Sequence, residues 1–161
     1  MALLLAGTVA IFEQSNEPAN EIRLYRLDCG DISMDMSSFS KNGEFAGERG
    51  ELANPCFLVR HPKGGLLWDT GFEESLVDIP DGVTDGTFHK EMHYRLSGQL
   101  AELGLSPSDI DYVSLSHSHP DHAGNANHFP DSTFLVQEEE YAYMFSPERR
   151  QDTSQFAYFS E

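Results

Sequence analysis

The sequence predicts a mixed α/β domain, and three observations carry that prediction. Its 161 residues are enough for one domain of ordinary size with a buried core. Short apolar strands recur along the chain, separated by turns and by stretches of helical spacing. Hydrophobic residues make up 39% and aromatic residues 11%, which argues against intrinsic disorder.

The first part of the domain is expected to consist of strands and loops. Residues 22–27 alternate apolar and charged side chains, as a half-buried strand does. Residues 28–50 are rich in Ser, Gly and Asp and predict a long loop. Residues 57–60 and 66–69 are two apolar strands, and the turn sequence between them predicts a hairpin. Residues 78–86 predict another loop.

The second part is expected to alternate helices and strands. Apolar residues at helical spacing from Met92 to Leu103, followed by Gly104, predict a helix with a glycine at its C-terminus. Ser106 and Pro107 are typical of the N-cap and first residue of a new helix. Two strands and a last helix, preceded by three glutamates, complete the pattern: residues 112–116, 134–137 and 141–145.

The N-terminal residues have an ambiguous pattern. Residues 1–12 carry no charged side chain and resemble the apolar region of a signal peptide, with small residues placed like a cleavage site. They lack the basic residues that begin such a signal, so a buried first strand is the alternative. We therefore leave exported and cytoplasmic locations equally open. We divide the chain into a signal-like segment and linker over residues 1–20 and a domain over residues 21–161.

Charge and composition narrow the classes of partner. The chain has 10 Lys and Arg against 27 Asp and Glu, a formal net charge of −17, which repels phosphate backbones and argues against nucleic acid. No apolar run reaches the roughly 20 residues of a membrane span. Two cysteines are too few for a disulfide framework, and Cys29 and Cys56 form no CxxC pair. The oligomeric state is left undetermined.

Histidine is concentrated in one segment that lacks basic side chains. Four of the seven histidines lie between His117 and His128. From Leu96 to Glu148 the chain has nine acidic residues and no Lys or Arg. A solvated acidic face is the ordinary explanation of such a segment. Imidazole and carboxylate groups together, however, suit a divalent metal.

The most informative segment directly follows a predicted strand and reads His117-Ser118-His119-Pro120-Asp121-His122. In extended backbone, residues i and i+2 share a face, so His117 and His119 can point together; a helix would set them about 200° apart. Pro120 interrupts strand pairing and turns the chain, which directs Asp121 and His122 toward a second position. These side chains form a ligand set for a pair of metals, with zinc first.

The alternative is a surface loop that happens to be rich in histidine, which is the usual explanation of an isolated histidine. An HxHxDH pattern directly after a strand favours the metal site instead. His128 is expected to be a capping or solvent-exposed residue. His61, His89 and His93 have no ligand spacing, and we assign them no metal role.

The HxHxDH pattern and the segment Leu66-Leu67-Trp68-Asp69-Thr70-Gly71 together resemble the metallo-β-lactamase superfamily of hydrolases. The resemblance implies an α/β fold, the N-terminal part of a metallo-β-lactamase-like αββα sandwich with the second half absent. It implies that His117 and His119 hold one divalent metal and that Asp121 and His122 hold a second. Asp69 would orient one of these ligands. Taken alone, Asp69 is more typical of a turn carboxylate bonded to its own backbone.

Within the superfamily, the chain is most similar to the N-acyl homoserine lactonases. The similarity extends from about residue 22 to residue 141 and rests on four segments: residues 25–38, 54–58, 121–125 and 136–141. The family's later elements include a third His, a metal-bridging Asp and a final His, whereas no histidine follows His128 here. We therefore expect residues 21–161 to be an incomplete domain from the N-terminal part of a longer protein.

The resemblance implies a hydrolase that opens the lactone ring of N-acyl homoserine lactones, which are small-molecule substrates. Two divalent metals, zinc foremost, would activate a water and polarise the carbonyl, and Asp121 would act catalytically by carrying a proton to the leaving alkoxide. Apolar side chains of the long loop are either a wall for the acyl chain or ordinary core and surface residues: Met34, Met36, Phe39 and Phe45.

Three alternatives remain beside the lactonase. A thioesterase or a β-lactamase would use the same metal chemistry, because a fold does not determine a substrate. A nuclease of this fold is disfavoured by the net charge of −17. A non-catalytic metal-binding fragment belongs to a different functional class. Because the ligand set is incomplete, we expect residues 1–161 alone to be inactive.

Overall fold

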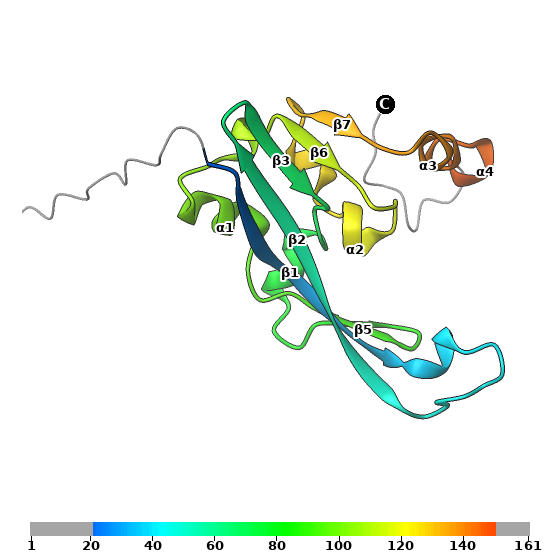
Figure 1. The fold of residues 1–161 in the computed structure, drawn as a ribbon. Coiled ribbons are helices and arrows are strands. Elements are labelled where there is room, and N and C mark those ends of the chain that lie inside the picture. Colours follow the sequence, from blue (N-terminus) through cyan, green and yellow to red (C-terminus); the bar gives the residue numbers. More distant parts are fainter. Residues whose placement is uncertain (1–20, 151–161) are drawn as a thin grey trace, which may run out of the picture.

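The computed structural model describes residues 21–150, which form a seven-stranded mixed sheet with short helices (Figure 1). The signal-like segment and linker expected over residues 1–20 lie outside the described residues. The strand order is β4-β5-β1-β2-β3-β6-β7. The strands are β1 (Arg23–Asp35), β2 (Arg49–His61), β3 (Gly64–Trp68), β4 (Val83–Asp85), β5 (Phe88–Glu91), β6 (Tyr112–Ser114) and β7 (Thr133–Leu135).

Within residues 21–150, four α-helices and four 3-10 turns connect or follow these strands. The α-helices are α1 (Leu96–Glu102), α2 (Pro120–Ala123), α3 (Glu138–Met144) and α4 (Pro147–Arg150). The 3-10 turns are η1 (Met36–Phe39), η2 (Glu74–Asp78), η3 (Pro107–Asp109) and η4 (Ala126–His128). Among residues 21–150, no helix is long and apolar enough to cross a membrane.

Strands β1 and β2 form a long antiparallel hairpin that projects from the body as an arm (Figure 1). The loop predicted over residues 28–50 is therefore too long at both ends, since β1 continues to Asp35 and β2 begins at Arg49; residues 36–48 form the loop and contain the turn η1. Many of the residues that pair β1 with β2 in the arm are polar. A polar composition of this kind is typical of loops, which is why the strands were not expected here. The Asp35 carboxylate closes the tip by accepting hydrogen bonds from the backbone N–H groups of Ser37 and Gly47, at 2.9 and 3.1 Å.

The apolar residues of this arm are not buried together. Met34 is buried within β1 and only 2% exposed, whereas Phe39 and Phe45 near the tip are 66% and 55% exposed. Met36 lies against Gly50 across the hairpin. These positions make the tip an apolar projection, in which the two phenylalanines face solvent.

A second hairpin, formed by β4 and β5, lies beside β1 at one edge of the sheet. The loop predicted over residues 78–86 is wrong at its end, because β4 occupies residues 83–85 and the chain turns at Gly86, where φ is +60°. Three residue pairs join β4 to β5, and three more join β5 to β1. Strands this short show too few alternations to be found by periodicity.

Helix α1 confirms the predicted helical segment but begins later than expected. It starts at Leu96, because Arg95 has extended backbone and its guanidinium bonds the Glu74 carbonyl at 3.0 Å and the Asp78 carboxylate at 2.5 Å. Gly104 has a φ of +72° just after the helix, as a C-terminal glycine should. The predicted start at Ser106 and Pro107 is confirmed, although the helix is the single 3-10 turn η3.

The core lies on the face of the sheet that α1 covers. Leu58, Leu67 and Val113 on neighbouring strands are each 0% exposed, and they cluster with Leu96 and Leu100 of the helix. Cross-strand pairing of Leu58 with Leu67, and of Leu67 with Val113, places the three strand residues on one face. This face therefore anchors the body of the domain.

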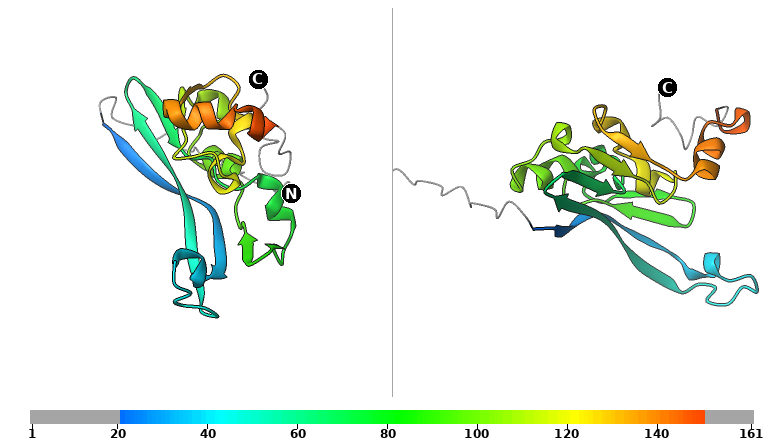
Figure 2. Two further views of the ribbon diagram at one scale, coloured as in Figure 1. Left: turned by 90° about the vertical axis from the view of Figure 1, so that its right-hand side faces the viewer. Right: turned by 45° about the horizontal axis from the view of Figure 1, so that its top comes forward.

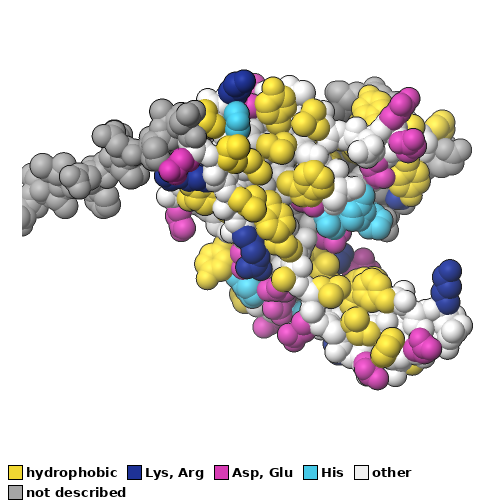
Figure 3. All heavy atoms as spheres, in the orientation of Figure 1, with side chains coloured by type: hydrophobic (Ala, Val, Ile, Leu, Met, Phe, Trp, Pro, Cys, Tyr) yellow, Lys and Arg dark blue, Asp and Glu magenta, His cyan; other side chains and the backbone are white. Residues whose placement is uncertain are grey.

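Both views of Figure 2 show the β1–β2 arm extending away from the body. The opposite face of the sheet is apolar and exposed (Figure 3). It carries Leu24, Trp68, Tyr112 and Leu135, which are 67%, 45%, 43% and 47% exposed. A sheet that is apolar on both faces is a layer that packs on both sides in a sandwich.

A disulfide between Cys29 and Cys56 joins β1 to β2 inside the core. Both cysteines are 0% exposed, and they lie where the β1–β2 pairing shifts register between Asp28 and Asp31. The bond is not predictable from the sequence, because two distant cysteines reveal no pairing by their spacing.

We expect the double substitution Cys29→Ala and Cys56→Ala to lower the free energy of unfolding by about 3 kcal/mol, because the bond closes a loop of 27 residues in the unfolded chain. Urea denaturation would measure the change. Reductant should lower the free energy of unfolding of the unsubstituted protein and leave that of the double variant unchanged. Equal stability of the unsubstituted protein with and without reductant would contradict the expectation.

Candidate metal centre

The two parts of the site follow the carboxyl ends of neighbouring parallel strands. Strand β3 pairs in parallel with β6, with Trp68 opposite Ser114. Asp69 follows β3 directly, and the HxHxDH segment begins three residues after β6 ends. Because the carboxyl ends of parallel strands meet at one edge of the sheet, the two loops are brought together where α/β sheets place their ligand sites.

The backbone of the HxHxDH segment changes from extended to helical at Pro120. His119 has φ −68° and ψ 152° and is the N-cap of α2, and Pro120 is the first residue of that helix. A proline is favoured at this position because its missing N–H has no partner there in any case. The predicted turn at Pro120 is thus the start of a one-turn helix that carries Asp121 and His122.

The structure brings the four predicted metal ligands together. The ring centroid of His117 lies 4.4 Å from that of His119 and 4.1 Å from that of His122. The Asp121 Oδ2 lies 3.2 Å from His122 Nε2. In Figure 3 these histidines form a cluster at the open side of the body that faces the hairpin arm.

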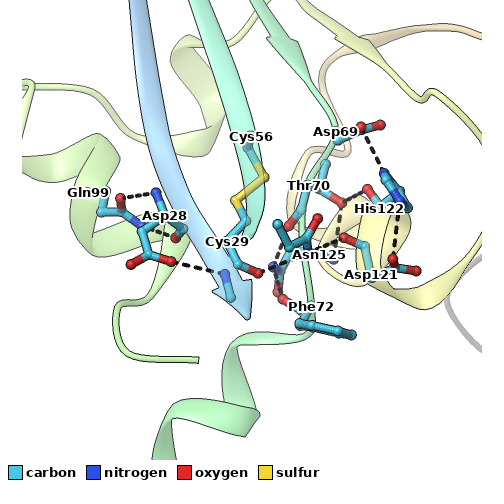
Figure 4. The surroundings of a disulfide bond; sticks show 12 residues. Asp28, Cys29, Cys56, Asp69, Thr70, Phe72, Gln99, Asp121, His122 and Asn125 are labelled. Carbon is cyan, nitrogen blue, oxygen red and sulfur yellow. Dashed lines mark hydrogen bonds and ion pairs between the residues drawn. A yellow bond between two sulfur atoms is a disulfide. The ribbon is translucent and has the colours of Figure 1, made fainter. Parts of the chain in front are cut away.

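Asp69 contacts this cluster through a buried carboxylate that is 5% exposed. It accepts hydrogen bonds from the Ser116 N–H at 2.7 Å and the Ser116 hydroxyl at 2.9 Å. Its Oδ2 also lies 2.9 Å from His122 Nδ1 (Figure 4). The partners of the Asp69 carboxylate thus come from the loop after β6 that contains the HxHxDH segment, and the Asp69 φ of +61° lies at the turn that faces this loop.

The pKa values of the clustered side chains are shifted in different directions. Burial of the His122 ring disfavours its charged form, but hydrogen bonds to Asp121 and Asp69 and the charges of both carboxylates raise the pKa of His122 to about 9. Burial, together with the neighbouring His122 and His119, lowers the pKa of His117. Burial alone would raise the pKa of Asp121, but its hydrogen bond to His122 and the positive charge there lower it overall.

Several buried side chains that the sequence analysis did not assign hold the two loops together. Asn125 is 0% exposed; its amide donates to the Thr70 and Phe72 carbonyls at 2.7 and 2.5 Å, and its Oδ1 accepts from the Glu74 N–H at 2.9 Å. The Thr70 N–H donates to the His122 carbonyl at 2.7 Å (Figure 4). The backbone at Gly124 lies so close to the turn after β3 that a Cβ at this position would be 2.6 Å from the Gly71 carbonyl oxygen.

Two further residues fix the ends of the ligand segment. The Asn54 amide donates to the Asp121 carbonyl at 2.6 Å and to the Cys29 carbonyl at 3.2 Å. Glu140, on α3, accepts a hydrogen bond from the Ser118 N–H at 2.7 Å. Both residues lie in segments that resemble the lactonases, and that resemblance was the only signal for them in the sequence.

The donor set has the chemistry of a divalent metal site. Three imidazoles and a carboxylate are ligands that borderline metals prefer. As the side chains stand, no group of three or more His, Cys, Asp or Glu among residues 21–150 is arranged to hold an ion. The His122 ring instead contacts carboxylates with both nitrogens, so metal binding requires the Asp121–His122 contact to open.

The remaining histidines lie apart from this cluster. His128 ends η4 and is exposed, as predicted. His61 is exposed at the turn between β2 and β3, where its Nδ1 accepts from the Lys63 N–H at 3.0 Å. His89 lies on β5, and His93 follows that strand.

Curated relatives share the sequence of this region. The N-acyl homoserine lactonase AttM of Azorhizobium caulinodans is 33% identical over 135 residues, which cover 80% of this chain and 50% of that protein. The N-acyl homoserine lactonase AiiA of Bacillus thuringiensis subsp. kurstaki is 33% identical over 129 residues, 74% of this chain and 50% of that protein. The chain thus spans about half the length of the curated relatives it matches.

Solved structures share the fold. An N-acyl homoserine lactone hydrolase with the product N-hexanoyl-L-homoserine at its catalytic metal centre matches with a TM-score of 0.65 and 30% identity, covering 78% of this chain and 52% of that one. The dizinc lactonase AidC matches in fold, with a TM-score of 0.53 and 23% identity, covering 79% of this chain and 45% of that one.

The family assignment rests on the greater part of the chain. The sequence model of the metallo-β-lactamase superfamily matches residues 49–161, which include β2, the Asp69 turn and the whole HxHxDH segment. The sheet and its helices are the N-terminal part of the corresponding fold, as predicted. The chain therefore belongs to the metallo-β-lactamase superfamily.

Proposed function

We propose that this chain is part of a hydrolase that opens the lactone ring of N-acyl homoserine lactones. The observation that carries the proposal is the contact between the buried Asp69 carboxylate and His122, within a cluster that also contains His117, His119 and Asp121. The relatives that match this region at about 30% identity are lactonases, which favours a small-molecule lactone as substrate.

His117 and His119 would hold one divalent metal, and Asp121 and His122 a second, with zinc the expected ion. Bound there, the metals would supply a water with a pKa lowered to roughly 7 and a Lewis acid for the carbonyl oxygen. Asp69 would keep the proton of His122 on Nδ1 and leave Nε2 free as a ligand. The Asp121 carboxylate would carry a proton toward the leaving alkoxide as the ring opens.

Other hydrolytic activities on the same residues are the second candidate. A thioesterase or a β-lactamase needs the same carbonyl chemistry, so only the substrate distinguishes it from a lactonase. A non-catalytic metal-binding chain would bind zinc through the same side chains without turnover. Measuring bound metal and hydrolysis side by side separates these candidates.

The disulfide bears on where the protein works. Bonds such as Cys29–Cys56 form and persist in oxidising compartments, namely the periplasm and the extracellular space. We infer that export is the better supported of the two locations left open by the sequence.

We expect the double substitution His117→Ala and His119→Ala to remove the most tightly bound zinc, because it deletes two of four donors and metal affinity depends on ligand number. Elemental analysis after dialysis would measure the loss. His128→Ala is the matched control, since His128 is an exposed histidine outside the cluster, and it should leave zinc content unchanged. Unchanged zinc in the double variant would show that the assignment is wrong.

Asp69→Asn should weaken zinc affinity by about 10–100-fold, the usual cost of losing a carboxylate that orients a ligand. The protein should remain folded, because the asparagine Oδ1 can still accept the hydrogen bond from the Ser116 N–H. Competition with a chelator would measure affinity, and circular dichroism would monitor folding. If the variant unfolds while the affinity of its folded fraction is intact, Asp69 has only a structural role.

We expect residues 1–161 alone, with zinc supplied, to hydrolyse lactones negligibly, because a two-metal site needs ions held about 3.5–4 Å apart and four donors leave that spacing unconstrained. The same chain extended by the half that its relatives carry should hydrolyse acylated homoserine lactones. A pH-based ring-opening assay would compare the two. Robust turnover by the short chain, or activity of the long one on thioesters or β-lactams instead, would contradict the proposal.

A further inference from the structure

The Cys29–Cys56 disulfide lies directly against the turn that carries Asp69. A Cβ at Gly71, two residues after Asp69, would be 2.4 Å from the Cys29 Cβ and 2.9 Å from its Sγ. The Phe72 N–H donates to the Cys29 carbonyl at 3.4 Å. In Figure 4 the labelled residues of the candidate metal centre lie beside the disulfide. The disulfide is therefore a direct neighbour of a loop that forms this centre.

The disulfide spans a bulge in the pairing of β1 with β2. Asp28 pairs with Pro55, and the next pair joins Asp31 to Ala53, so two residues of β1 stand opposite the single residue Asn54. Bulges of this kind bend a strand and re-aim a side chain, and they are frequent next to active sites. One cysteine belongs to the bulge, and the other follows Asn54 by two residues on β2. The covalent bond therefore holds the bulge in place.

Asn54 connects this bulge to the ligand segment. Its side chain is buried and 6% exposed, and its amide nitrogen has two hydrogens to donate. One hydrogen bond goes to the Cys29 carbonyl at 3.2 Å, and the other goes to the Asp121 carbonyl at 2.6 Å. A single amide group thus ties the bulge to the residue whose carboxylate is a proposed metal ligand.

Helix α2 needs such contacts from outside because it is a single turn. Its carbonyl groups have no partners within so short a helix, and a helix of four residues is not stable by itself. The turn after β3 holds its second half, since the His122 carbonyl accepts from the Thr70 N–H at 2.7 Å and from the Thr70 hydroxyl at 3.1 Å. Asn54 holds the Asp121 carbonyl from β2. The direction of the Asp121 carboxylate therefore depends on Asn54.

We propose that Asn54 is a positioning residue for the Asp121–His122 half of the metal centre, and that the Cys29–Cys56 disulfide holds Asn54 in the position it needs. The two act as one support, so the loss of either weakens zinc binding at that half by a similar factor. This inference rests on the proposed function, because it concerns the same metal centre. It gives the disulfide a role in the site beyond its contribution to the stability of the fold.

Gln99 of α1 provides a matched control next to the same disulfide. Its amide donates to the Asp28 carbonyl at 2.7 Å and accepts from the Asp28 N–H at 2.8 Å, so it also bonds β1 beside Cys29 (Figure 4). These bonds do not involve the HxHxDH segment. Gln99→Ala and Asn54→Ala each remove two hydrogen bonds between a side chain and the backbone, but only Asn54→Ala removes one to α2.

The first measurement follows backbone amides of the full chain without zinc. The His122 and Ala123 N–H groups donate to the His119 carbonyl at 2.9 and 3.0 Å, so their hydrogen exchange reports the opening of α2. Asn54→Ala should accelerate this exchange about 5-fold relative to the amides of β3, as expected for the loss of one hydrogen bond. The comparison with β3 removes the effect of a change in global stability. Gln99→Ala should leave the ratio unchanged.

The second measurement is zinc affinity, by competition with a chelator. Asn54→Ala should weaken binding of the more weakly held zinc ion about 10-fold, the lower end of the range for residues that support metal ligands. Cys29→Ala with Cys56→Ala should do the same, and Cys29→Ala with Cys56→Val, which restores lost volume, replaces it if the alanine variant does not fold. Combining Asn54→Ala with either pair should weaken binding no further, because the two act as one support. Gln99→Ala should leave the affinity unchanged.

The possible failures give different results. Equal effects of Asn54→Ala and Gln99→Ala in either measurement would overturn the inference, because they would show a general effect on stability. Unchanged exchange in α2, or effects of Asn54→Ala and of the cysteine substitutions that multiply when combined, would overturn it as well. Absence of zinc binding by the unsubstituted chain would instead overturn the proposed metal centre, and the exchange ratio alone would then decide whether Asn54 holds α2.

Discussion

The arrangement of the site depends on the hydrogen bonds of one buried carboxylate, Asp69. It links the turn after β3 to the loop after β6 through Ser116 and His122. A carboxylate that is only 5% exposed is costly to bury unless its oxygens accept hydrogen bonds. Asp69 meets that condition only while the HxHxDH loop is in place. Folding of the turn and formation of the histidine cluster are therefore coupled.

The polar contacts around Asp69 extend this coupling to the backbone. Asn125 donates to or accepts from three backbone groups of residues 70–74, and Gly124 admits the backbone of the same turn at close range. A buried polar network of this kind is stabilising when each member has its partners. Because hydrogen bonds are directional, this network holds the two loops in one relative position. A hydrophobic contact is not directional and would allow more positions.

Local signals in the sequence predicted the parts of the fold that local physics determines. The β2–β3 hairpin, the glycine after α1 and the proline at η3 depend on residues within a few positions of each other, and all three were predicted. The long β1–β2 arm was not, because its strands gain their pairing from residues some 20 positions away and their composition is polar. The Cys29–Cys56 bond was missed for the same reason, since only the register of the arm brings the two cysteines together.

The histidine cluster shows how far a pattern in the sequence can go. In the HxHxDH segment the donors are contiguous, so the residues could be named before their geometry was known. Asn125 and Glu140, whose hydrogen bonds hold the surrounding loops, lie outside that segment, and no spacing rule connects them to it. The cluster lies in a chain with a net charge of −17. That charge repels anions and raises the local concentration of divalent cations, and the imidazoles of the cluster would make the site specific for borderline metals. In the proposed site, acidic composition and clustered histidine would thus act together: the first would attract the ion, and the second would select it.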